Sequence, residues 1–324
     1  SFESGNGSVS FLQVACKTLV KTTVGDFLIK RCQGRHTSSK FISLYLLFAI
    51  GFKGGVAVAE HGVGLSLGLA IGAGVAMSFV LPFIAFGLLR GMSRMGPLDA
   101  AAVAAHYGSI SIVTFVAGTS VVEAAGFKPE GFMVAVAAAM EAPAILSALW
   151  LAARTGKAGG VEPGLWREIM LNGSIVLLIG AFAIGWITGP KGLSEVAPLL
   201  VAPFKGVLCL FLLDMGLVAG RGLRGGGKVL DRGAIVFALV MPLIGGAAGA
   251  ILGAGIGLST GGIALLAILG ASGSYIAVPA AMRVAMPEAN PSIYLTLSLG
   301  VTFPFNLTIG LPIYLWMAQT VSGG

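Results

Sequence analysis

The sequence predicts an all-α polytopic membrane protein that contains two inverted five-helix repeats, with one broken helix in each. Of the 324 residues, 56% are hydrophobic and only 10% are charged, whereas soluble domains carry about 25% charged residues. Long apolar segments follow one another with short breaks, and the two halves of the chain share short motifs in the same order. The composition excludes a soluble globule. The 50 glycines are scattered along the chain, which excludes a collagen-like protein.

Nine apolar segments are long enough to cross a membrane as helices, which requires about 20 residues. Glycine, proline and charged residues separate them. Only helices and closed barrels satisfy their backbone polar groups in lipid, and these segments are too long for barrel strands. In chain order the predicted spans are 41–59, 64–90, 99–125, 131–153, 166–189, 196–220, 233–257, 261–284 and 291–318.

The segment before the first span differs from the rest of the chain. Residues 1–40 are rich in Ser, Thr and Lys and contain no long apolar run, so we describe them as a poorly specified N-terminal segment. The predicted organisation is a first repeat over 41–153, a cytoplasmic linker over 154–165 and a second, inverted repeat over 166–324. The second repeat has five spans and the first has four. The first helix is therefore predicted to be degenerate or missing.

Basic residues are distributed unevenly between alternate loops. The loops of one set hold Arg90, Arg94, Arg154, Lys157, Arg167, Arg221, Arg224, Lys228, Arg232 and Arg283. The other set holds only Lys128 and Lys191. Cytoplasmic loops of membrane proteins carry an excess of Lys and Arg, so the first set is predicted to be cytoplasmic. The net charge of +7 is thus a sign of topology, and no nucleic-acid partner is expected.

An internal repeat is visible at an offset of 165 residues. Residues 47–52 pair with 212–217, and His106-Tyr107-Gly108-Ser109 pairs with Ala271-Ser272-Gly273-Ser274. Chance similarity between Gly- and Ala-rich segments is the alternative for any single match, but the constant order argues against it. The loop charges give the paired elements opposite orientations, and inverted repeats of this kind are common in secondary transporters.

Two spans carry a polar, glycine-containing centre, at 106–114 and at 271–275. Non-helical backbone is tolerated at membrane depth only when it is buried in protein or lines a cavity. In transporters with inverted repeats, such interruptions form half-helices whose N-terminal ends face an anionic substrate. Free N–H groups and serine hydroxyls, Ser109 among them, could bind a small oxyanion there. The alternative is that these glycines and serines only aid helix packing.

Glu141 is an ionisable residue inside an apolar span, where charges are costly and usually paired or functional. It lies two residues before Pro143, and a proline leaves backbone carbonyls free. A carboxylate beside free carbonyls suits Na⁺ or H⁺ coupling. A glutamate satisfied by a neighbouring helix is an equal alternative.

Several motifs resemble those of the sodium-dependent bicarbonate transporter family, the SbtA-like permeases of cyanobacteria and other bacteria. The resemblance runs from Phe41 to Gly324. The motifs are Ile50-Gly51-Phe52-x-Gly54-Gly55; Asp99-Ala100 with Gly108, Ser111 and Thr114; Glu141-Ala142-Pro143; Ala271-Ser272-x-Ser274 with Arg283; Ala289-Asn290-Pro291-Ser292-x-Tyr294, Pro304, Pro312 and Ala318-Gln319-Thr320.

This resemblance implies a Na⁺-dependent bicarbonate symporter with core and gate domains that works by an elevator-type movement. It implies a homotrimer in the plasma (inner) membrane of a bacterium, with a PII-like regulatory protein as a possible cytoplasmic partner. The expected substrate-binding residues are Gly108, Ser109, Ser111, Ser272, Gly273 and Ser274. The expected Na⁺-binding residues are Thr114, Glu141, Ser111 and Ser274. Na⁺ is expected as the coupling ion, without a resident cofactor or another metal.

The chain departs from the family at the second polar centre. Cyanobacterial members have Ser-Ser-Ser-Asp where this chain has Ser272-Gly273-Ser274-Tyr275. One alternative therefore keeps the fold and changes the function to Na⁺- or H⁺-coupled transport of another small anion or carboxylate. Another is a non-transporting membrane sensor that recruits a PII-like protein. An enzyme is not expected, because the sequence contains no nucleophile–base pair, metal-ligand spacing or dinucleotide-binding motif.

Overall fold

The computed structural model describes residues 36–61, 64–141, 143–154, 173–204, 206–207, 209–210, 213, 230–275, 278–279, 282, 286 and 288–323. Within these residues every regular element is a helix, which confirms the all-α prediction. The predicted degenerate or missing first helix, the end of span 196–220 and the linker 154–165 lie largely or wholly outside them. Among the described residues, five helical stretches are long and apolar enough to cross a membrane: Leu65–Met92, Pro97–Ala124, Met133–Leu151, Arg232–Gly255 and Pro291–Val321.

The helices of the first half largely follow the predicted spans. They are α3 (His36–His61), α4 (Leu65–Met92), α5 (Pro97–Gly108), α6 (Ile112–Ala124), α7 (Met133–Ala139) and α8 (Pro143–Arg154). Helix α3 starts before the predicted boundary at residue 41, so it includes the end of the N-terminal segment. Span 131–153, expected as one helix, is two helices, because Pro143 has no N–H to continue the hydrogen-bond ladder of α7.

The second half begins with α10 (Gly173–Leu200), followed by α12 (Arg232–Gly255) and α13 (Thr260–Ala271). Helix α10 passes through the predicted gap between two spans, but it kinks at Gly189, where φ is 60° and Pro190 follows. The last long helix is composite. It consists of α15 (Pro291–Leu295), the π-helix η1 (Thr296–Thr302), α16 (Phe303–Phe305), the π-helix η2 (Asn306–Gly310) and α17 (Leu311–Val321).

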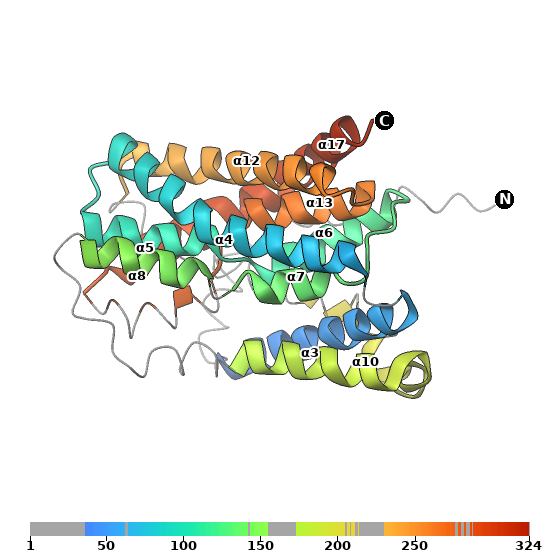
Figure 1. The fold of residues 1–324 in the computed structure, drawn as a ribbon. Coiled ribbons are helices and arrows are strands. Elements are labelled where there is room, and N and C mark those ends of the chain that lie inside the picture. Colours follow the sequence, from blue (N-terminus) through green and yellow to red (C-terminus); the bar gives the residue numbers. More distant parts are fainter. Residues whose placement is uncertain are drawn as a thin grey trace.

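The bundle has two parts (Figure 1). Helices α3 and α10 lie side by side at one edge, and their contact is the most extensive between any two described helices. They share a small apolar cluster of Ala49, Phe52, Val56 and Leu200. The main apolar core lies mainly among the other helices and also includes Leu46 of α3. Helix α7 makes most of the contact between the described residues of α3 and α10 and that core.

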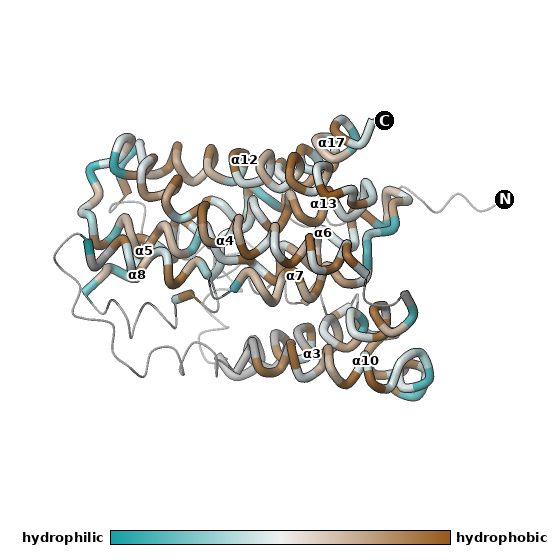
Figure 2. Tube along the Cα trace, viewed as in Figure 1, coloured by the Kyte–Doolittle hydropathy of each residue, from teal (hydrophilic) through white to brown (hydrophobic). Residues whose placement is uncertain are grey.

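The broken helices occupy the middle of the larger part. In α5, α6 and α13 most residues are buried, whereas α4 and α12 expose apolar side chains such as Val80 and Ile251 on their outer faces. Figure 2 shows hydrophobic residues along the length of these helices and hydrophilic residues gathered at the two ends of the bundle. This is the pattern of helices that surround a shielded centre and face lipid outside.

At each end of the bundle, hydrogen bonds join loops that belong to the same set by charge. At one end the Arg94 N–H donates to Asp231 Oδ2 over 3.0 Å. At the other end the Ser259 N–H donates to Glu130 Oε1 over 2.7 Å, and the Ser259 hydroxyl donates to the Lys128 carbonyl. Helix α4 therefore ends where α12 begins, so the two helices run in opposite directions.

Candidate functional site

The first break is the segment 109–111 between α5 and α6. The Ser109 N–H closes α5 by donating to the Ala105 carbonyl over 3.2 Å. Ser111 caps α6, because its hydroxyl oxygen accepts from the Thr114 N–H at 3.2 Å and from the Thr114 hydroxyl at 3.0 Å. A serine in extended backbone conformation is a favourable N-cap, and Ser111 has φ −106° and ψ 109°. The sequence therefore ends one helix and starts another inside a single span.

The second break is the segment 272–274, which follows α13. The Ser272 side chain and N–H both donate to the Leu269 carbonyl, at 2.8 and 3.2 Å. The Ser274 hydroxyl oxygen accepts from the Val278 N–H at 3.4 Å, so it performs the capping role that Ser111 performs in the first break. Each break thus contains one serine whose N–H closes the preceding helix and one whose hydroxyl oxygen accepts from an N–H that follows the break.

The two breaks contact each other directly. The Ser111 N–H donates to the Ser272 hydroxyl oxygen over 3.0 Å, and the Ser274 N–H donates to the His106 carbonyl over 2.7 Å. These two bonds join segments more than 160 positions apart in sequence. They satisfy backbone groups that a broken helix leaves open in an environment without water.

The equivalent glycines of the two breaks have different surroundings. A Cβ atom on Gly108 would overlap the Pro82 ring and lie 2.8 Å from the Ser78 carbonyl oxygen. A Cβ atom on Gly273 would lie 3.6 Å from its nearest neighbour, Ser298 Cβ. Gly108 is therefore required by close packing against α4, whereas the space around Gly273 accepts a methyl group.

Glu141 lies at a third interruption, between α7 and α8, and is 8% exposed. The residue before it, Met140, accepts a hydrogen bond of 2.6 Å from the Ser78 hydroxyl. The Ser78 carbonyl faces Gly108, so α4 connects this interruption to the first break. The Glu141 Oε2 atom is buried and has no hydrogen-bond partner among the described residues.

A stripe of buried polar residues on the last helix packs against both breaks. Its members recur every four residues: Tyr294, Ser298, Thr302 and Asn306, with Tyr314 further along. In an α-helix four residues overshoot a full turn by about 40°, so such a stripe would wind around the helix. The wider turns of η1 and η2 keep it on one face.

This stripe binds the ends of both broken helices. The Asn306 side-chain amide donates to the Ala271 carbonyl over 2.9 Å, and its oxygen accepts from the Tyr314 hydroxyl at 2.7 Å. Thr302 donates to the Ala238 carbonyl and pairs with the Tyr107 hydroxyl, each over 2.7 Å. Both broken helices are therefore anchored to one neighbouring helix.

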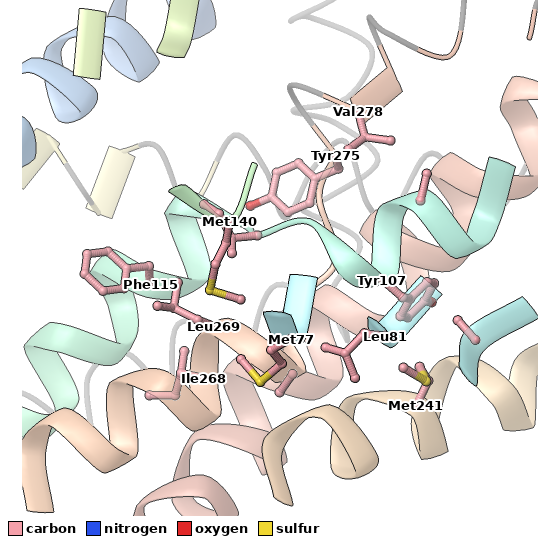
Figure 3. Close-up of a cluster of buried hydrophobic side chains, with 14 of the residues drawn as sticks. Met77, Leu81, Tyr107, Phe115, Met140, Met241, Ile268, Leu269, Tyr275 and Val278 are labelled. Atoms are coloured by element: carbon pink, nitrogen blue, oxygen red, sulfur yellow. The ribbon is translucent and has the colours of Figure 1, made fainter. Parts of the chain in front are cut away.

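Two further side chains complete the surroundings of the breaks. The His106 ring stacks on Tyr294 with 4.5 Å between centroids, and its Nδ1 lies 2.7 Å from the Ala102 carbonyl oxygen. Figure 3 shows Tyr275, which follows the second break, with its hydroxyl directed toward Met140. His106 Nε2, the Ser109 hydroxyl and the Tyr275 hydroxyl are buried without a hydrogen-bond partner among the described residues.

The structure brings together most of the residues expected at the site. Ser111, Thr114 and Ser272 are linked by hydrogen bonds, and Ser274 bonds the His106 carbonyl at the end of α5. Gly108, Ser109 and Gly273 lie in or directly beside the two breaks, whereas Glu141 lies at the separate interruption between α7 and α8. Helix N-termini with hydroxyls can bind an oxyanion, and helix C-termini with a carboxylate can bind a cation. No group of three His, Cys, Asp or Glu side chains converges within the described part of the chain.

Sequence reasoning missed the contribution of the last helix. Ser298, Thr302 and Asn306 were not singled out, although all are polar residues in an apolar span. The four-residue spacing of the stripe was the available signal. It does not fit the 3.6-residue period of an α-helix, so it becomes meaningful only once π-helical turns are known.

Comparison with known families matches the chain from residue 34 to residue 319 to the family model of the Na⁺-dependent bicarbonate transporter superfamily. A search of curated proteins found no match. Because the family match covers most of the chain, the protein belongs to the Na⁺-dependent bicarbonate transporter superfamily. The resemblance inferred from the sequence motifs is confirmed.

Proposed function

We propose that this superfamily member is a secondary active transporter that carries bicarbonate together with Na⁺ across the membrane. The observation that carries the proposal is the direct contact of two helix breaks in the buried centre of the bundle. Superfamily membership supports a membrane transporter for bicarbonate and Na⁺. The symport mechanism and the residues that bind each ion are our proposal.

The anion would bind at the first turn of α6. The first N–H groups of a helix lack intrahelical acceptors. Of these, the Ser111 N–H is taken by Ser272 and the Thr114 N–H by the Ser111 hydroxyl. The N–H groups of Ile112 and Val113 have no acceptor among the described residues. They lie at the positive end of the helix dipole and can donate to an oxyanion without a buried arginine.

The cation would bind on the side of Glu141. Its buried carboxylate oxygen has no partner among the described residues, and a buried charge of this kind requires a counterion or a proton. Backbone carbonyls freed at the interruption before Pro143 would supply further oxygen ligands. A cation here would also offset the charge of an anion at α6, which couples binding of the two ions.

An elevator-type movement is supported by the division of the bundle into two parts. We propose that α3 and α10 belong to the gate domain and that the helices around the breaks form the core domain. The small α3–α10 cluster is separate from the main core. The opposite directions of α4 and α12 support two inverted repeats, because α12 follows α4 at nearly the 165-residue offset.

The test is uptake of ¹⁴C-bicarbonate into proteoliposomes with and without an inward Na⁺ gradient. We expect accumulation that requires Na⁺ and is abolished by collapsing the gradient. Uptake driven equally well by a proton gradient would replace Na⁺ with H⁺ as the coupling ion. Absence of uptake under either gradient, with correctly folded protein, would refute the transport proposal.

A further inference from the structure

Tyr275 carries a buried hydroxyl that nothing in the fold uses. The side chain is 8% exposed, and its ring packs edge-on against Phe303 with centroids 5.2 Å apart. A buried tyrosine hydroxyl usually finds a hydrogen-bond partner, yet this one has none among the described residues. Packing against Phe303 explains the ring and leaves the hydroxyl unexplained.

The neighbouring Ser111 cannot act as an acceptor for Tyr275. The Tyr275 hydroxyl lies next to the Ser111 side chain. The Ser111 oxygen already accepts from the Thr114 N–H and from the Thr114 hydroxyl. A hydroxyl oxygen has two lone pairs, so both are occupied. The Tyr275 hydrogen therefore has no acceptor at Ser111 and remains available as a donor, and the Ser111 hydrogen can turn either to the Tyr275 oxygen or to a bound anion.

These hydroxyls add two donors to the free N–H groups at the start of α6. Ile112 and Val113 supply backbone donors there, and Ser111 and Tyr275 supply hydroxyl donors from opposite breaks. The groups that remain available here are hydrogen-bond donors, because the Ser111 oxygen already accepts two hydrogen bonds. Such a site favours an anion over a cation. Directional donors also favour an oxyanion over a spherical halide, since each oxygen lone pair can be matched separately.

We propose that the Tyr275 hydroxyl donates a hydrogen bond to the transported oxyanion and, with Ser111, determines selectivity for bicarbonate over chloride. This inference rests on the proposed function and extends it to a residue from the second break. It also assigns a role in anion binding to the contact between the two breaks. The anion then bridges the two broken helices, so its binding depends on their relative position.

The experiment compares two Tyr→Phe variants, each of which removes one buried hydroxyl and keeps the ring. For Tyr275→Phe we expect a roughly tenfold higher KM for bicarbonate, which is the loss of about one hydrogen bond. The KM for Na⁺, the maximal rate and the thermal unfolding midpoint should stay unchanged. Inhibition by chloride should become stronger relative to uptake. For Tyr107→Phe, whose hydroxyl bonds Thr302, we expect a lower midpoint and an unchanged KM.

A binding measurement distinguishes failure of this inference from failure of the proposed function. Purified protein is heated with sodium bicarbonate or sodium chloride, and protection from thermal unfolding is recorded. Protection by bicarbonate that Tyr275→Phe reduces supports the site even if uptake is absent. An unchanged bicarbonate KM and unchanged protection in Tyr275→Phe would overturn the inference while leaving transport intact. Tyr275→Met, which fills the space without a hydroxyl, must behave as Tyr275→Phe does; a wild-type KM in Tyr275→Met would also overturn it.

Discussion

The two breaks occupy equivalent positions in the sequence repeat, but they are held in different ways. The first is held by packing: Gly108 is pressed against Pro82, and the Tyr107 ring packs edge-on against Phe237 at 4.8 Å. At the second break, Ala271 and Ser272 replace His106 and Tyr107. Hydrogen bonds donated by Asn306 and Ser111, and one donated to the His106 carbonyl, hold the chain there. The first break is therefore the less adjustable of the two, because a dense core resists displacement more than a set of hydrogen bonds does.

This difference suggests a division of roles in transport. The first break supplies the capped N-terminus of α6, so it presents donors in a constant geometry. At the second, a Cβ atom on Gly273 would make only ordinary van der Waals contacts, and the chain is held by the hydrogen bond from the Asn306 amide. We expect the second break to adjust when ions bind. The predictions below test this contrast through paired substitutions.

The largest effect is expected from adding a methyl group to the first break. Gly108→Ala would force its Cβ into the Pro82 ring and toward the Ser78 carbonyl, and overpacking of this kind costs about 1–3 kcal/mol. The matched control is Gly273→Ala, for which the nearest atom is 3.6 Å away. Thermal unfolding in detergent should show a lower midpoint only for Gly108→Ala. Equal midpoints for the two variants would contradict the contrast.

Removing the hydrogen bonds at the second break should have an effect of comparable size. Asn306→Leu leaves the Ala271 carbonyl and the Tyr314 hydroxyl without partners. Each unsatisfied buried group costs about 1–3 kcal/mol. We expect a lower unfolding midpoint and slower bicarbonate uptake. Thr308→Val is the control on the same helix, because the exposed Thr308 hydroxyl bonds only its own helix at Pro304. Wild-type behaviour of Asn306→Leu would show that packing alone holds the second break.

A smaller effect is expected at the hydrogen bond between Tyr107 and Thr302. Tyr107→Phe removes one bond of 2.7 Å, while Thr302 keeps its bond to Ala238. The loss should be about 0.5–1.5 kcal/mol, measured as a shift of the denaturation midpoint. If Tyr107→Phe lost more stability than Asn306→Leu does, hydrogen bonding would be the main support of the first break. That result would contradict the assignment of packing to the first break and hydrogen bonds to the second.

The smallest effects concern two serines, one from each break. Ser272→Ala removes the acceptor of the Ser111 N–H and should cost about 1 kcal/mol. Ser109→Ala removes a hydroxyl without a partner among the described residues, so its unfolding midpoint should remain within about 0.5 kcal/mol of wild type. If Ser109 contacts the anion, as proposed from the sequence, Ser109→Ala should still raise the bicarbonate KM. An unchanged KM would remove Ser109 from the site.

The sequence predicted several local features because each has a local physical cause. The helical stretches at 65–92, 232–255 and 291–321 follow from long apolar runs, and the interruptions near Gly108 and Gly273 follow from glycine and serine in otherwise apolar spans. The division of loops by charge matches the two ends of the bundle. The break in span 131–153 was not predicted, although Pro143 was seen, because prolines such as Pro82 and Pro242 lie inside continuous helices in the same chain.

What the sequence determined by itself is the helical class, most of the apolar helices, the two glycine- and serine-containing interruptions and the membership of a transporter family. These depend on hydropathy over about 20 residues, on backbone preferences of single residues and on short motifs. Only the tertiary structure decided which groups meet: Ser111 with Ser272, His106 with Ser274, and Asn306 with Ala271. It also showed that the buried Tyr275 hydroxyl has no hydrogen-bond partner among the described residues. Such contacts join distant segments whose approach depends on the packing of all the helices between them, and no local pattern encodes that packing.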